Sequence, residues 1–147
     1  MLVKESLLKF ENFAVLSSSC RYNHGENLTN EFVQSYPIDI DLEILQHQDE
    51  SKFKVFVSVK LNEENKPGYS INVVSATLLS ISSSASASDI DILIKHSGVQ
   101  MAIANLRAYI EIITSYYPLG KYIMPTIDLN DLLDKKAHSF TENNAAN

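Results

Sequence analysis

The sequence predicts an α+β protein, in which a four-stranded antiparallel sheet is followed by one long helix and a short C-terminal helix. Apolar and polar residues alternate through most of residues 38–81, which is typical of strands with one buried face. Apolar residues then recur three and four positions apart over residues 99–113, as on one face of a helix. The 147 residues suit one domain, which we expect over residues 1–137 with a polar, flexible tail over residues 138–147.

The first strand is expected within residues 8–22. It is marked by apolar residues at Leu8, Phe10, Phe13, Val15 and Tyr22. Their alternation changes phase between Phe10 and Phe13, which predicts a β-bulge near Asn12. Residues 24–36 are too numerous for a hairpin loop, so they predict a crossover from the first strand to the second.

The second and third strands form the clearest hairpin in the sequence. Apolar residues alternate with polar ones at Ile38, Ile40, Leu42 and Ile44, and again at Phe53, Val55, Val57, Val59 and Leu61. Matching the two buried faces places Ile40 opposite Val59, and it then places Asp39 opposite Lys60. The turn residues 65–68 (Asn-Lys-Pro-Gly) separate this hairpin from a fourth strand, which runs from Tyr69 to Ile81.

The long helix follows a Ser/Ala linker at residues 82–88. Ser88 is the expected N-terminal cap, and the helix should end near Tyr117 because Pro118 and Gly120 follow. One apolar face would pack on the sheet. A second face carries Ala102, Tyr109, Ile112 and Tyr116. We expect that face to contact a second subunit, although a helix packed between two layers of one domain is the alternative. Asp128 should then cap the short helix over residues 129–137.

Composition and charge narrow the range of functions. The net charge is −6 and no basic stripe is present, so nucleic-acid binding is not expected. No stretch reaches the roughly 18 apolar residues of a membrane span, and the N-terminus lacks the apolar run of a signal peptide. The single cysteine, Cys20, allows no intrachain disulfide and is expected as a small buried residue. We therefore expect a cytoplasmic protein.

Catalytic and cofactor motifs are not found. The four histidines are scattered, and none has a metal-ligand spacing with another histidine or with Cys20. The sequence also has no glycine-rich phosphate loop and no nucleophile elbow. The acidic row of Asp39, Asp41 and Glu43 is interpreted as a solvated strand face, and a metal or acid–base role is the less favoured alternative. We expect no enzyme activity, no metal and no cofactor.

The crossover carries apolar residues that the sheet and helices do not explain. Leu28, Phe32, Val33 and Tyr36 lie within its otherwise polar sequence. They either hold the crossover on the domain or line a groove for an extended or unfolded partner. A groove of this kind would accept varied sequences because apolar contact is non-directional.

The order of these elements resembles the SecB family of protein-export chaperones, over residues 7–136. The strand segments YPIDIDLEIL and FKVFVSVKLNEENKPGYSINVV are similar to the family's central strands. NLRAYIEIITSYYP resembles the end of the family's long helix, with Arg107 on its arginine, and LGKYIMPTIDLNDLL resembles the loop before its last helix, with Pro125 on its proline. Val99 and Ala104 replace two family prolines, and the family's Gly-Gly-Phe pattern in the fourth strand is missing near Ser75. The chain therefore resembles a divergent branch.

The resemblance implies a homotetramer, built as a dimer of dimers with helices at the interface, that binds unfolded preproteins. It implies client grooves formed by the crossover and the last helix. Carried onto this chain, these would comprise Phe32, Val33, Tyr36, Leu129, Leu132 and Leu133. The family passes its clients to the SecA motor partly through an acidic sheet surface, which would be Asp39, Asp41 and Glu43 here. It implies no nucleotide and no catalysis.

Three functions follow as hypotheses. The first is a holdase that keeps preproteins unfolded for export. The second is a SecB-like chaperone dedicated to one client, such as an antitoxin. The third is a structural or interaction subunit without chaperone activity. The departures from the family pattern keep the second hypothesis open.

Overall fold

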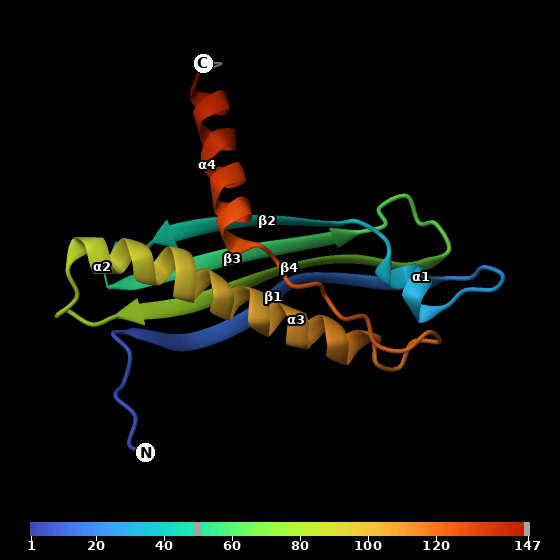
Figure 1. The fold of residues 1–147 in the computed structure, drawn as a ribbon, viewed down its shortest axis with the longest axis horizontal. Helices are drawn as coiled ribbons and strands as arrows, with labels where there is room; N and C mark the ends of the chain where they lie inside the picture. The colour runs from blue at the N-terminus through green and yellow to red at the C-terminus, as the bar shows by residue number, and fades with distance from the viewer. Residues whose placement is uncertain (49–50, 146–147) are drawn as a thin grey trace.

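Four strands form one antiparallel sheet, and a long helix covers one of its faces (Figure 1). This computed structural model describes residues 1–48 and 51–145. The strands are β1 (Leu8–Asn23), β2 (Ile38–Gln46), β3 (Lys52–Leu61) and β4 (Gly68–Ile81), in the spatial order β1-β4-β3-β2. Because β1 and β2 lie at opposite edges, the segment between them crosses the sheet and contains the short helix α1 (Asn30–Gln34). The predicted fold class and the crossover are confirmed.

The strand registers agree with the hydrophobic pattern. Ile40 pairs with Val59, and Asp39 pairs with Lys60, as the matching of buried faces predicted. The pairing of β1 with β4 shifts between Phe10 and Asn12, which confirms the predicted bulge. A second shift lies between Val15 and Ser17, where the alternation of apolar residues had not predicted one.

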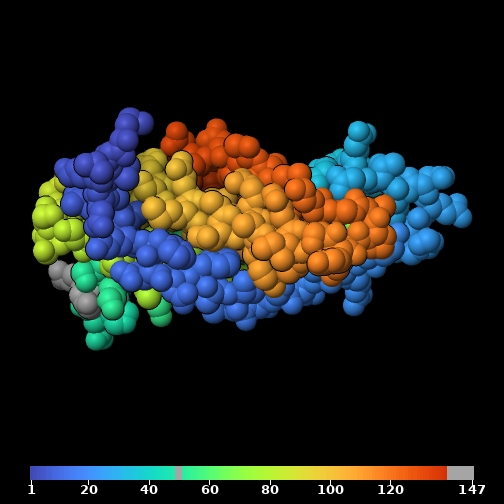
Figure 2. All heavy atoms as spheres, turned by 90° about the horizontal axis from the view of Figure 1, so that it is seen from below, coloured from blue at the N-terminus to red at the C-terminus, as the bar shows by residue number. Residues whose placement is uncertain are grey.

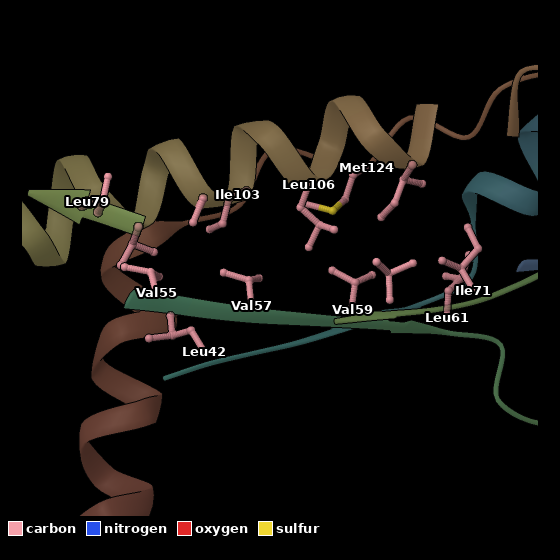
Figure 3. Close-up of a cluster of buried hydrophobic side chains, with 14 of the residues drawn as sticks. Leu42, Val55, Val57, Val59, Leu61, Ile71, Leu79, Ile103, Leu106 and Met124 are labelled. Carbon is pink, nitrogen blue, oxygen red and sulfur yellow. The ribbon is translucent and has the colours of Figure 1, made fainter. Parts of the chain in front are cut away.

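The core is a single apolar layer between the sheet and the long helix (Figure 3). Alternate residues of the two central strands point into it and are buried there, because the long helix covers this face of the sheet. They meet Leu106 and Ile110 from the helix, and Met124 from the loop that follows. Figure 3 shows Val55, Val57, Val59 and Leu61 in a row along β3, facing the side chains below the long helix.

The long helix has three segments, α2 (Ala87–Ile92), the π-helix η1 (Leu93–Gly98) and α3 (Val99–Thr114). Ser86, rather than the expected Ser88, caps it, because the Ser86 Oγ accepts a hydrogen bond from the Asp89 N–H at 3.2 Å. The π turn was not predicted. At its end, a Cβ added to Gly98 would lie 2.8 Å from Leu79 Cδ1, so a glycine lets this turn approach β4 closely.

The second face of the helix is only partly as expected. Ala102 is fully buried within the chain's own core, which corrects its assignment to a subunit interface. The apolar stripe is broad enough to include it beside Ile103 and Leu106.

Tyr109 is half-buried, and its hydroxyl donates to Ser18 Oγ on β1 at 2.8 Å. Figure 2 shows the yellow-to-orange helix lying against the blue strand β1. Only Ile112 (67% exposed) and Tyr116 (96%) of the four face solvent.

The helix ends at Thr114, three residues before the predicted Tyr117, and a hydrogen-bonded turn follows. The Thr114 hydroxyl donates to the Ile110 carbonyl at 2.7 Å and accepts from the buried Tyr122 N–H at 2.8 Å. The Tyr117 hydroxyl donates to the Cys20 carbonyl at 2.8 Å. These bonds fix the return loop against the sheet.

The last helix, α4 (Leu129–Ala145), projects away from the sheet past the β2 edge (Figure 1). The Asp128 carboxylate accepts from the Asp131 N–H at 3.0 Å, as the predicted cap. The helix continues beyond the expected end at Ala137, so residues 138–145 of the expected tail are helical. Their sequence contains no Gly or Pro that would stop a helix. Residues 146 and 147 lie outside the described residues.

Candidate binding groove

An open, mainly apolar groove of about 530 Å³ lies where β2, η1 and α4 meet. It is lined by Leu42 and Ile44 from β2, Lys95 and His96 from η1, and Asn130, Leu133, Asp134, Lys136 and Ala137 from α4. Its volume is within the range of protein pockets that bind ligands. The groove is therefore large enough for a few apolar side chains of a partner.

Local sequence patterns explain which residues line this groove. The alternation along β2 directs Leu42 and Ile44 to the helix-covered side of an edge strand. Helical spacing puts Asn130, Leu133 and Ala137 on one face of α4. Figure 3 shows Leu42 beside α4, at the outer end of the core.

The π-helix provides the third wall. Lys95 and His96 are exposed and line the groove from this segment. The Lys95 ammonium forms an ion pair with Asp91 at 3.0 Å, one helical turn earlier. π turns occur frequently at functional sites, and this one lies directly against the groove.

An ion pair joins the α4 and β2 walls of the groove. Lys136 Nζ of α4 lies 2.7 Å from Asp41 Oδ1 of β2. The same carboxylate oxygen accepts a hydrogen bond from the Leu42 N–H at 2.8 Å. The Lys136 side chain is only 23% exposed, so much of its aliphatic stem is covered.

The predicted client-binding residues do not form one continuous surface. Leu133 lines the groove. Leu132 is half-buried against the core, and Leu129 lines a separate pocket of about 290 Å³ with Ile103 and Arg107. The Arg107 guanidinium donates to the carbonyls of residues 124 and 125, which positions the loop leading into α4.

The crossover residues lie at the opposite end of β2. Phe32 is 46% exposed, and its ring packs edge-on against Tyr36 with centroids 5.4 Å apart. Tyr36 lines a pocket of about 330 Å³ together with Ile38 and Lys60, and its hydroxyl donates to the Pro67 carbonyl at 2.6 Å. Two hollows therefore flank the β2 edge, one at each end.

Val33 is not available to a partner. Its side chain is fully buried, so its assignment to a client groove is corrected. The short helix α1 turns Val33 inward and Phe32 outward, because neighbouring helical residues point in different directions. Thr29 Oγ1 caps this helix by accepting from the Phe32 N–H at 3.2 Å. Val33 thus holds the crossover on the domain, while Phe32 remains exposed.

The acidic row of Asp39, Asp41 and Glu43 is exposed on the outer face of β2. It is not a uniform surface, because the Asp41 carboxylate is engaged by Lys136. Asp39 lies opposite Lys60 in the strand register, and the Lys60 ammonium lies 3.4 Å from Glu63. Among the described residues, no three His, Cys, Asp or Glu side chains are grouped as a metal site.

Sequence reasoning missed most of the groove. The period-two pattern identified Leu42 and Ile44 as inward-facing residues, but it could not show that α4 leaves a hollow beside them. No sequence pattern identified Lys95 and His96 as groove residues, because the π turn that presents them was not predicted. Within the described part of the chain, no helix has the length and apolar character needed to cross a membrane.

Cys20 is half-buried and packs against the core. Burial raises the pKa of its thiol, outweighing the opposing effect of its hydrogen bonds. The thiolate form is therefore disfavoured at neutral pH, which fits a small packing residue better than a nucleophile.

No family model matches the chain, and no curated protein matches it either. Among solved structures, it is similar to the Mycobacterium tuberculosis Rv1957 SecB-like chaperone in complex with a ChAD peptide from the Rv1956 HigA1 antitoxin. That match has a TM-score of 0.59 and 13% identity over 82% of this chain and 88% of the other. A Streptococcus agalactiae protein of unknown function has a TM-score of 0.48 and 11% identity, over 81% and 97%. The chain therefore has a SecB-like fold.

Proposed function

We propose that this protein is a chaperone that binds unfolded polypeptide segments along its β2 edge. The observation that carries the proposal is the apolar groove between β2, η1 and α4, with Leu42, Ile44 and Leu133 on its walls. The exposed Phe32 and the Tyr36 pocket would provide a second contact further along the same edge. The SecB-like fold supports a chaperone role.

Apolar burial explains how such a site would recognise unfolded chains. Each Å² of apolar surface removed from water contributes roughly 25 cal/mol. Folded proteins keep most of their large apolar side chains inside, whereas unfolded segments present them. The groove would therefore bind the unfolded form and delay folding by mass action.

We also propose that the chain forms a homo-oligomer through the outer face of α3. Ile112 on α3 and Tyr116 in the turn that follows it are both large and exposed. Contacts between subunits would cover them and would align several grooves, which adds avidity for one long client. A tetramer and docking of SecA at Asp39, Asp41 and Glu43 remain predictions of the family resemblance.

A titration would test the chaperone proposal. Reduced and carboxymethylated α-lactalbumin, which stays unfolded, would carry a fluorescent label, and its anisotropy would be measured against added protein. We expect the unfolded form to bind and native α-lactalbumin not to bind.

Leu133→Asp should weaken binding at least tenfold, because it places a charge in the groove. Leu16→Asp, at an exposed site on β1, is the matched control and should bind like wild type. Equal binding by all three proteins would contradict the assignment.

The second candidate is a chaperone dedicated to one client. The structural neighbour bound to an antitoxin peptide favours it, as does the departure of this chain from the SecB sequence pattern. A panel of unrelated unfolded proteins distinguishes the two. Similar affinities across the panel indicate a general holdase. Weak binding to every panel protein, together with tight binding to a single protein captured from the native host, indicates a dedicated chaperone.

A further inference from the structure

The contact between Asp41 and Lys136 joins α4 to the outer edge of β2. We propose that Asp41 is a positioning residue of the groove: it holds α4 beside β2 and closes the strand edge at Leu42. This inference rests on the proposed client binding and assigns the groove a preformed shape.

The strand pairing shows that Leu42 faces the open edge. The His47 N–H donates to the Lys52 carbonyl at 2.8 Å, and these two residues continue the register of the β2–β3 hairpin. In an antiparallel pair, every second residue exchanges backbone bonds with its partner. Residues 39, 41, 43, 45 and 47 therefore bond to β3, and the Leu42 N–H points outward.

Asp41 satisfies that outward donor. Its Oδ1 accepts from the Leu42 N–H at 2.8 Å, in the middle of an edge that could otherwise pair with another strand. A partner chain is therefore directed to bind through its side chains in the hollow. Addition of a continuous fifth strand would require this bond to break.

The same oxygen positions the opposite wall. Lys136 reaches it at 2.7 Å, and the covered stem of Lys136 forms part of the groove lining. Leu133, one turn earlier on α4, is thereby held opposite Leu42 and Ile44. Because Asp41 is 65% exposed, the ion pair contributes little stability, and its effect is mainly to restrict where α4 lies.

Three variants test this role. Asp41→Ala removes both contacts, and Lys136→Met keeps an aliphatic stem but removes the charge. Lys54→Ala is the matched control, because Lys54 is a charged, exposed residue on the same face of the sheet, on the neighbouring strand β3, and this variant should bind like wild type. The probe is the labelled, carboxymethylated α-lactalbumin.

We expect Asp41→Ala and Lys136→Met each to weaken binding about threefold. The double variant should be no weaker than either single one, because both remove the same contact. Without any client, the Leu42 amide should exchange hydrogen faster in Asp41→Ala but not in Lys136→Met. Lys136→Arg should bind like wild type.

Other results would overturn the inference. If Asp41→Ala binds the unfolded probe as tightly as wild type, Asp41 does not position the groove. The same conclusion follows if the double variant loses the sum of the two single losses of affinity. Unchanged exchange of the Leu42 amide in Asp41→Ala would show that the strand edge is not closed by this residue. If wild-type protein itself binds no unfolded probe, the proposed function fails, whereas the exchange measurement still tests the contact.

Discussion

At the residue scale, adjacent side chains of the crossover have opposite roles. Val33 is fully buried, whereas Phe32 is 46% exposed and packs on Tyr36. A sequence pattern treats both as apolar residues of a loop. The short helix α1, which Thr29 caps, points the two side chains in different directions. One residue stabilises the fold, and its neighbour is available to a partner.

Alanine substitutions should separate these two roles. Val33→Ala should lower the free energy of unfolding by about 1–3 kcal/mol, because it leaves a cavity in the core. Phe32→Ala should change stability by less than about 1 kcal/mol, because half of its ring is already exposed, but it should weaken binding of unfolded α-lactalbumin. Urea denaturation and anisotropy measure the two effects. Loss of client binding in a fully folded Val33→Ala protein would contradict this division.

At the element scale, patterns that are local in sequence predicted most of the fold. The four strands, the β2–β3 register, the bulge near Asn12 and the crossover all follow from alternation and its breaks. The second bulge, near Leu16, was missed because small and polar residues on both sides hide the change of phase. The burial of Ala102 depends on how widely the helix contacts the sheet, which is a tertiary property.

The groove could not be predicted either, because it too is a tertiary property. It arises from the angle at which α4 leaves the sheet and from the π turn in the long helix. Neither has a periodic signature. Of the six predicted client residues, Leu133 lies in this groove, whereas Phe32 and Tyr36 lie at the other end of β2. The predicted client residues therefore include one groove residue of α4 and none of β2 or η1, and the sequence did not show how these elements meet.

The π turn leads to a prediction about Gly98. Alanine normally favours helices over glycine by about 1 kcal/mol. Here its Cβ would lie 2.8 Å from Leu79 Cδ1, so Gly98→Ala should instead destabilise the protein by roughly 1–3 kcal/mol. Shortening the neighbour in Gly98→Ala/Leu79→Val should recover part of that loss. A single variant more stable than wild type in urea would show that the helix can move away from β4.

At the scale of the whole molecule, the outer face of the long helix remains partly apolar. Ile112 and Tyr116 are exposed, while Tyr109 is tied to Ser18 of the same chain. If subunits associate through this face, Ile112→Asp should lower the mass measured by light scattering. Ile92→Asp, at a similarly exposed site on α2, is the control and should leave the mass unchanged. An unchanged mass in Ile112→Asp would exclude this interface.

The whole fold should also lose stability in alkaline solution, because tyrosines link the return loop to the sheet. Burial, with the hydrogen bond to Cys20 as a second cause, raises the pKa of Tyr117 to about 12, and burial also raises the pKa of Tyr69 and of Tyr122. An unfolded tyrosine titrates near pH 10. Between about pH 10 and 12 the folded state therefore holds more protons than the unfolded state. Stability from these groups is fully present below about pH 10 and is lost as the pH rises towards 12.

Urea midpoints measured from pH 8 to pH 11.5 should be level at first and then fall above about pH 10. Tyr117→Phe should have a lower midpoint at pH 8, because its bond to the Cys20 carbonyl is lost, and a shallower fall above pH 10. Tyr116→Phe is the control, since Tyr116 is 96% exposed and should keep the wild-type profile. If Tyr117→Phe and wild type fell equally steeply, the alkaline loss would have to come from other groups, and the raised pKa of Tyr117 would not contribute to it.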